Sequence, residues 1–149
     1  MGSITEIKSK KIIFFDGYCN LCNSQVNNIL SIDKKNIFHY SALSSKFAIK
    51  ALKGKIDKKN MGKSIVFLNN GRVHIKSKAV LMILSEIGGI YNLFSFFKIF
   101  PSFILDLFYN IIARNRYAWF GKSKNCFIPT KEISSRFIND WVYYLLLKK

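Results

Sequence analysis

A short apolar run followed by a turn and a helix constrains this chain more than any other feature. Lys11 to Phe15 reads KIIFF, which is typical of a buried β-strand, and Asp16-Gly17 marks a sharp turn directly after it. From Cys19 to Ile32 the apolar residues recur at helical spacing, and the polar stretch 33–36 ends that pattern. The sequence therefore predicts a strand, a tight turn and a helix over residues 11–32.

The next segments continue this alternation of strands and helices. We predict a strand at 37–40, a helix at 43–52 capped by Ser41 or Ser44, a hairpin of 64–68 and 72–75 with Asn70-Gly71 at its tip, and a helix from Ser77 to about Ile87 closed by Gly88-Gly89. After residue 89 we predict only helices, at about 92–99, 102–119 and 131–147. The order β-α-β-α-β-β-α is that of the thioredoxin fold, whose first two strands pair in parallel. We expect a single α/β domain over 1–149, with a thioredoxin-like core at about 11–89 and an α-helical C-terminal extension at about 90–149.

Cys19-Asn20-Leu21-Cys22 is the strongest chemical signal in the chain. Cys19 falls at the start of the predicted helix, and Cys22 lies one turn further along the same face, within reach of a disulfide. Backbone N–H groups at a helix N-terminus stabilise an anion, so this position favours a Cys19 thiolate. Thiol–disulfide exchange needs an attacking thiolate and a second thiol that resolves the mixed disulfide. We predict that Cys19 is the exposed nucleophile and Cys22 the buried resolving thiol.

Other interpretations of the CxxC pair stay open. A zinc site also uses this spacing, but it needs four ligands, and the rest of the chain offers only Cys126, His39 and His74. Two further alternatives are a structural pair of buried thiols and a non-catalytic thioredoxin-like module that binds a partner through a basic or apolar face. A CxxC after the first strand of an α/β pattern favours redox use, so we expect no metal and no cofactor.

Asp16 precedes the pair and has two candidate roles. It is either a proton relay for Cys22, if it lies buried behind the pair, or a turn-forming residue whose carboxylate caps the next helix. Its negative charge opposes a Cys19 thiolate, and the intervening Asn20-Leu21 carries no cation. We therefore expect a pair that works on the reducing side.

Three ordered blocks resemble the DCC family of predicted thiol–disulfide oxidoreductases, which is named for its Asp and two Cys. The blocks are Asp16 to Cys22; Tyr109, Ala113 to Tyr117 and Trp119 to Gly121; and Cys126 to Thr130. The resemblance covers roughly residues 11–138 and implies a thioredoxin-like fold with disulfide exchange at Cys19 and Cys22. Thioredoxins place a cis-proline just before the third strand, whereas here that stretch is Met61 to Ser64, so recognition of the substrate backbone must differ at this place.

The second and third blocks supply further candidate residues. Gly17, Asn115, Arg116 and Tyr117 are candidate supporting residues of the site. Arg116 either complements the dipole at the end of a helix or reaches the cysteine pair and supports its thiolate. Cys126 is a third redox thiol, a zinc ligand or, as we favour, a buried thiol that acts as a small apolar residue.

The formal net charge of +16 comes almost entirely from lysine. We attribute it to a compositional bias and a solvated surface, so we expect weak, salt-sensitive binding of polyanions and no specific nucleic-acid partner. The expected partners are a disulfide-containing protein or small molecule and a thiol electron donor. With three cysteines, and an N-terminus that lacks the apolar region of a signal peptide, we expect a cytoplasmic location.

Residues 90–112 form an apolar segment long enough to span a bilayer, with Lys98 and Asp106 as its only charges. Because Pro101 interrupts the segment, we expect two helices that meet there and pack on the core. Peripheral contact with a lipid surface and a true membrane span are the alternatives.

Overall fold

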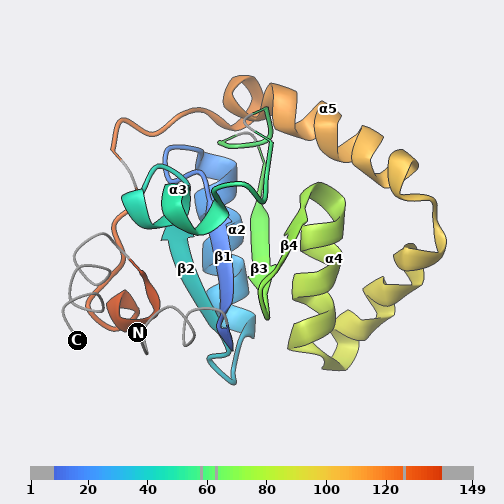
Figure 1. Ribbon diagram of the computed structural model, residues 1–149, viewed down its shortest axis with the longest axis horizontal. Helices are drawn as coiled ribbons and strands as arrows, with labels where there is room; N and C mark the ends of the chain where they lie inside the picture. Colours follow the sequence, from blue (N-terminus) through green and yellow to red (C-terminus); the bar gives the residue numbers. More distant parts are fainter. Residues whose placement is uncertain (1–8, 58, 63, 126, 139–149) are drawn as a thin grey trace.

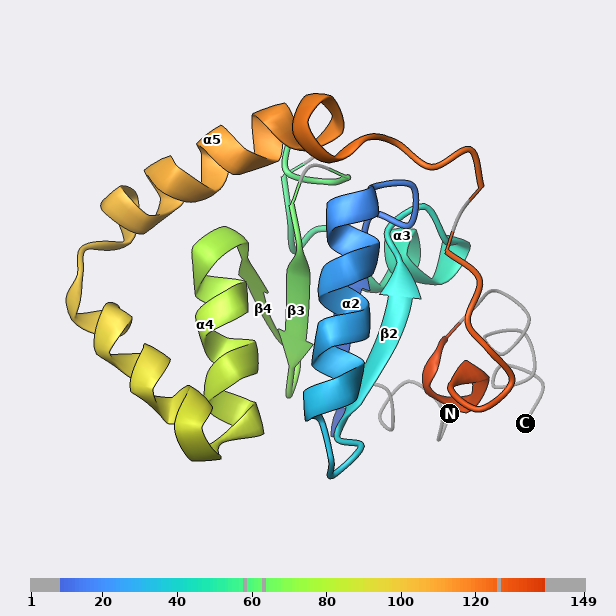
Figure 2. The same cartoon turned by 180° about the vertical axis from the view of Figure 1, so that it is seen from behind.

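The central strand of the fold is β1 (Lys11–Phe15), in a four-stranded sheet of order β2-β1-β3-β4 (Figures 1 and 2). The computed structural model describes residues 9–57, 59–62, 64–125 and 127–138. β1 pairs in parallel with β2 (Phe38–Ala42) and antiparallel with β3 (Val66–Asn69), and β3 pairs antiparallel with β4 (Arg72–Ile75). This topology confirms the predicted crossover and hairpin, and the chain has a thioredoxin-like α/β fold.

Helices cover both faces of the sheet, which explains why β1 is apolar throughout. α2 (Asn20–Ile32) and α4 (Lys76–Ile87) pack on the face that carries Ile13 and Phe15, and α3 (Lys46–Leu52) packs on the opposite face. Alternate residues of a strand point to opposite faces, so a strand covered on both faces needs an unbroken apolar run. All four residues from Ile12 to Phe15 are buried.

The predicted hairpin turn is confirmed, but the N-cap residues predicted for α3 are wrong. Asn70 and Gly71 adopt φ values of 48° and 80°, as a tight hairpin turn requires. The N-cap of α3 is Ser45, whose hydroxyl accepts the Ala48 N–H at 3.0 Å, so the predicted caps Ser41 and Ser44 are wrong. Ser41 lies buried in β2 and Ser44 precedes the capping position.

Ser77 does not cap α4, because the helix begins one residue earlier and its N-cap is Ile75. The Ser77 hydroxyl hydrogen-bonds instead to the carboxylate of Asp106. That bond ties the first turn of α4 to α5 (Ser102–Phe120). Gly88, with φ of 74°, ends α4 as predicted.

The extension begins with η1 (Gly89–Ile99), a 3₁₀-helix that meets α5 at Pro101 with a bend of 112°. The predicted break at Pro101 is confirmed, and α5 packs one face on α4 and α2, but the expected packing of η1 on the core is wrong. η1 contacts α4, yet none of its residues is buried, and many large apolar side chains of η1 and α5 face solvent. Among the described helices, none alone is long and apolar enough to cross a membrane.

The predicted helix at 131–147 is wrong over its described part. Residues 131–138 form a turn, the short 3₁₀-helix η2 (Ser134–Arg136) and an extended end beside β2. The Ile138 N–H donates to the Tyr40 carbonyl at 2.7 Å, and Phe137 and Ile138 enter the cores on opposite faces of the sheet. An extended chain can place neighbours on opposite faces, whereas a helix cannot. The remainder of the prediction, 139–147, lies outside the described residues.

Candidate active site

The two cysteines lie together where β1 turns into α2. Cys19 is the N-cap of α2 and its sulfur accepts the Cys22 N–H at 3.3 Å. Neither cysteine is in a disulfide. The predicted placement of two thiols across the first helical turn is confirmed. The Cys19 sulfur accepts a backbone N–H and faces the positive end of the helix dipole.

The burial of the two thiols is the reverse of the expectation. Cys19 is fully buried, whereas Cys22 is only partly buried. The expectation of an exposed Cys19 is wrong because a segment more than a hundred positions away in the sequence covers it. This segment, residues 121–125, is called the strap below; Lys122 forms a β-bridge with Cys19, and the Ser123 N–H donates to the Tyr18 carbonyl at 2.8 Å.

Gly121 turns the chain from the end of α5 into the strap. Its φ of 81° belongs to the left-handed region that favours glycine, and an added Cβ would lie 3.1 Å from the Asn20 side-chain nitrogen. That nitrogen donates to the Phe120 carbonyl at 3.0 Å. Just beyond the strap, the Phe127 N–H donates to the carbonyl of buried Gly17 at 3.0 Å. The turn before the pair and the strap therefore hold each other in place.

Asp16 and Arg116 form an ion pair beside the thiols. One Asp16 oxygen accepts the Tyr18 N–H at 3.0 Å and shapes the turn, while the other lies 3.1 Å from the Arg116 guanidinium. The Tyr117 hydroxyl also hydrogen-bonds to that second oxygen, and Arg116 donates to the Gly62 carbonyl at 2.8 Å. The carboxylate thus acts on the turn, and the helix cap is Cys19 itself. Arg116 reaches the site from α5 instead of binding the last carbonyls of its own helix.

The surroundings of Cys22 favour its protonated form. Burial is the largest effect, and together with the hydrogen bond to Cys19, the charge of Cys19 and the charge of Asp16 it raises the pKa of Cys22 to about 12. The positive charge of Arg116 acts in the opposite direction and lowers that pKa. The surroundings therefore keep the Cys22 thiol protonated.

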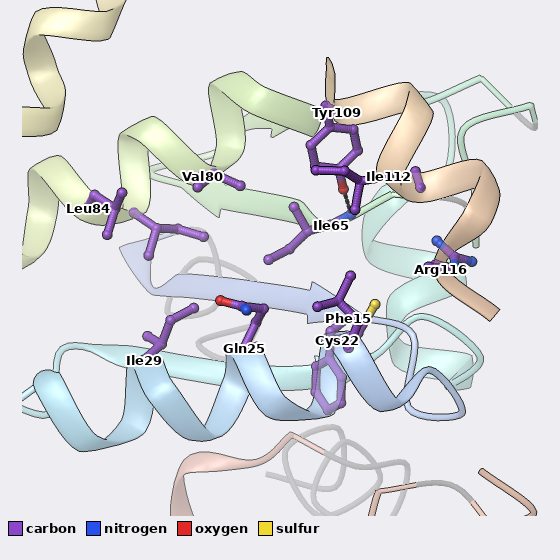
Figure 3. Close-up of a pocket in the computed structure, with 13 residues that line it drawn as sticks. Phe15, Cys22, Gln25, Ile29, Ile65, Val80, Leu84, Tyr109, Ile112 and Arg116 are labelled. Atoms are coloured by element: carbon purple, nitrogen blue, oxygen red, sulfur yellow. Dashed lines mark hydrogen bonds between the residues drawn. The ribbon is translucent and has the colours of Figure 1, made fainter. Parts of the chain in front are cut away.

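A cavity of about 360 Å³ opens beside Cys22, between α2, α4 and α5 (Figure 3). Cys22 lines it and Cys19 does not. Figure 3 places the Cys22 sulfur and Arg116 at one end, with Leu84 and Ile29 toward the other. Most lining side chains are apolar, and the polar ones are Cys22, Gln25, Tyr109 and Arg116. A molecule in this cavity would touch apolar walls and the Cys22 sulfur.

Comparison with known proteins identifies the family. A family model described as DCC1-like thiol-disulfide oxidoreductase matches residues 13–122, which include both thiols, Asp16 and Arg116. This chain belongs to that family. It is 34% identical over 128 residues to the Bacillus subtilis protein YuxK, covering 86% of this chain and 93% of the relative. It is 37% identical over 126 residues to a chloroplastic DCC family protein of Arabidopsis thaliana, covering 84% of this chain and 73% of the relative. No solved structure matches the chain significantly.

Tyr109 takes a structural place in this DCC1-like site that sequence reasoning did not assign. Its hydroxyl accepts the Ile65 N–H at 2.9 Å, drawn as a dashed line in Figure 3. Burial raises the pKa of Tyr109 to about 12, so it stays a neutral phenol. The backbone groups of Ile65 and Gly62 flank the place where thioredoxins carry their cis-proline, and here side chains of α5 bind both of them. The only sequence signal for Tyr109 is its place in the second family block.

Of the other candidate residues, Asn115 lies apart from the described DCC1-like site. Asn115 donates to the Ile111 carbonyl of its own helix at 2.9 Å. Among the described residues it makes no hydrogen bond to the cysteine pair, so its predicted supporting role is not supported. Successive helical residues point about 100° apart, which explains why Arg116 reaches the thiols and its neighbour does not. Cys126 lies outside the described residues. Within the described part of the chain, no three His, Cys, Asp or Glu side chains converge on a point that could hold a metal ion.

Proposed function

We propose that this protein reduces disulfides by thiol–disulfide exchange, with Cys19 as the attacking thiolate and Cys22 as the resolving thiol. The observation that carries the proposal is the position of the Cys19 sulfur, which caps α2 and accepts the Cys22 N–H at 3.3 Å. Hydrogen bonds and a helix N-terminus stabilise negative charge on the acceptor. The family assignment supports the same reaction class.

The proposed cycle has two exchange steps. The Cys19 thiolate attacks one sulfur of the substrate disulfide, forms a mixed disulfide and releases the other sulfur as a thiolate that takes up a proton. Cys22 then loses its proton and attacks the Cys19 sulfur, which forms the Cys19–Cys22 disulfide and releases the second substrate thiolate. The substrate gains two electrons and the pair loses two. A dithiol electron donor of the same chemical class reverses these steps and restores the pair.

Attack by Cys19 requires the strap to move aside, because the sulfur is fully covered in the reduced state. The strap is held by few backbone bonds, so local opening costs much less than unfolding. We assign Arg116 and Asp16 to the second step. The guanidinium favours the Cys22 thiolate that must form, and the carboxylate holds the guanidinium in place.

The cavity beside Cys22 supports selection of substrates with an apolar group next to the disulfide. Its walls match an apolar group, and its polar end holds the sulfur that expels the product. A strong oxidant needs a strongly stabilised reduced form, whereas the pKa of Cys22 is raised by burial and by Cys19. We assign the pair to the reducing side because the negative charge of Asp16 opposes a Cys19 thiolate and Asn20-Leu21 carries no cation.

Trapping of a small aromatic disulfide tests the proposal. In a Cys126→Ser background, Cys22→Ser should accumulate a mixed disulfide on Cys19, identified by peptide mass spectrometry, and Cys19→Ser should accumulate far less on Cys22. The protein with both active-site cysteines should release two thiols per disulfide consumed. Trapping confined to Cys22 would reverse the assigned roles. Failure of both variants to form any adduct, with the folded state verified by circular dichroism, would refute the redox function.

A further inference from the structure

η1 and α5 together form a surface that is called the apolar arm below, residues 89–120. Figures 1 and 2 show it as an arc that leaves the end of α4 and returns to the strap over the active site. Large side chains along it are open to solvent, among them Ile90 (78% exposed), Leu93 (75%) and Phe103 (72%). An apolar surface of this extent is unusual on a soluble protein and indicates an interaction site.

The spacing of the exposed residues makes the arm an amphipathic surface. On α5, Phe103, Leu107 and Ile111 follow one another at intervals of four residues and are all exposed. Such residues lie on one face of a helix, while Tyr109 and Arg116 on other faces line the Cys22 cavity. α5 therefore has one face on the protein and another without a partner within the described chain.

Most charged side chains along the arm and the strap are basic, although Glu86 of α4 lies near Lys98. Between residues 89 and 130 the only acidic residue is Asp106, and its carboxylate is hydrogen-bonded to Ser77. Lys98 and Arg114 are exposed on the arm, and Lys122 and Lys124 are exposed on the strap that follows it. An apolar face bordered by lysine and arginine matches a surface that combines acyl chains with anionic headgroups.

Two observations argue against a second copy of the chain and against a bilayer crossing as the occupant of this face. A second copy of the chain would bring two molecules of net charge +16 together, and their repulsion opposes association. A bilayer crossing is opposed by the 112° bend between η1 and α5. A helix pair bent in this way can lie along an interface with its apolar side chains immersed.

We propose that the apolar arm docks on the surface of an anionic lipid bilayer. Its apolar side chains enter the interface, and the basic side chains contact lipid phosphates and carboxylates. Removal of one inserted large apolar side chain should weaken binding roughly tenfold. Removal of one surface cation should weaken it roughly fivefold, and high salt should release the protein. This binding does not depend on the proposed redox function.

Flotation with phosphatidylcholine vesicles, with and without phosphatidylserine, tests the proposal. The full-length protein should float with the phosphatidylserine vesicles and be released by high salt. Leu93→Ser with Phe103→Ser should abolish flotation, whereas Ile49→Ser, which changes a side chain 51% exposed on α3, should not. Lys98→Gln with Arg114→Gln should weaken binding, whereas Lys53→Gln with Lys55→Gln, exposed after α3, should not.

Tryptophan fluorescence distinguishes docking at the apolar arm from electrostatic binding through another surface of the protein. Trp119 is 58% exposed on α5, so in a Trp141→Phe background its emission should shift to the blue on anionic vesicles. A double variant, Cys19→Ser with Cys22→Ser, should bind as tightly as the wild type. No flotation, equal flotation without phosphatidylserine, equal loss in the Ile49 or lysine controls, or a concentration-dependent dimer lost in the Leu93/Phe103 variant would overturn the proposal.

Discussion

Two buried ion pairs join the C-terminal part of the chain to its N-terminal part, and they differ in what surrounds them. Arg116 of α5 binds Asp16 in the turn before α2, and Arg136 of η2 binds Asp33 at the end of α2. Each connects residues about a hundred positions apart. Similar chemistry therefore closes both ends of the same helix.

The neighbours of the two pairs give them different consequences. Asp33 is almost completely buried and also accepts the N–H groups of Ile37 and Phe38, so it holds the chain between α2 and β2 and ties η2 to it. Arg116 lines the cavity beside Cys22 and lowers the pKa of that thiol. The Asp33 pair is thus a structural contact, and the Asp16 pair is placed to act on chemistry.

The largest expected difference between the two pairs is in stability. Arg136→Met leaves the Asp33 carboxylate buried without its cation and should lower the free energy of unfolding by about 3 kcal/mol. Arg116→Met should cost about 1 kcal/mol, because Asp16 keeps the Tyr117 hydroxyl and the Tyr18 N–H. Urea unfolding of both variants measures the difference. Equal losses would contradict the division between the two pairs.

The reactivity of Cys22, in contrast, should depend on Arg116 and not on Arg136. Because burial and Cys19 raise its pKa to about 12, alkylation of Cys22 should increase about tenfold per pH unit between pH 7 and 10 without a plateau. Arg116→Met removes the charge that lowers this pKa, so the thiolate fraction and the alkylation rate should fall about tenfold at each pH. Arg136→Met should leave the profile unchanged. Peptide mass spectrometry after timed iodoacetamide treatment measures both, and an unchanged profile in Arg116→Met would remove its assigned role.

A smaller effect is expected at the strap, which separates Cys19 from solvent. Asn20→Ala removes the hydrogen bond to the Phe120 carbonyl and should raise the population of the open strap, and hence Cys19 alkylation, about fivefold. Asn28→Ala, further along α2, is the control and should not change Cys19 labelling. Equal labelling of Cys19 in both variants would show that the strap does not limit access.

The sequence predicts the core well because the signals there are local. The apolar run of β1, the helical spacing after Cys19 and the Asn70-Gly71 turn each depend on a few neighbouring residues. The placement of two thiols across one helical turn follows from the same local geometry. These predictions hold because no distant segment competes with them.

The remaining features depend on contacts between distant segments. Cys19 is buried and forms a β-bridge with Lys122, and no local pattern near Cys19 indicates this contact. The arm is as apolar as a core helix, so its composition predicts burial, although its large side chains are exposed. The sequence alone does not distinguish Arg116 from Asn115 as a candidate. The orientation of α5 about its axis places Arg116 beside Asp16 and turns Asn115 away.

Equilibration of the Cys126→Ser protein in glutathione redox buffers tests the central claim most directly. The account predicts a reversible two-electron transition between the dithiol and an intramolecular Cys19–Cys22 disulfide, with a midpoint closer to about −270 mV than to about −120 mV. Intact-mass and peptide analysis would follow both forms. A protein that yields only glutathione adducts on Cys22, and no internal disulfide at any ratio, would contradict the assignment of Cys19 and Cys22 as a redox pair.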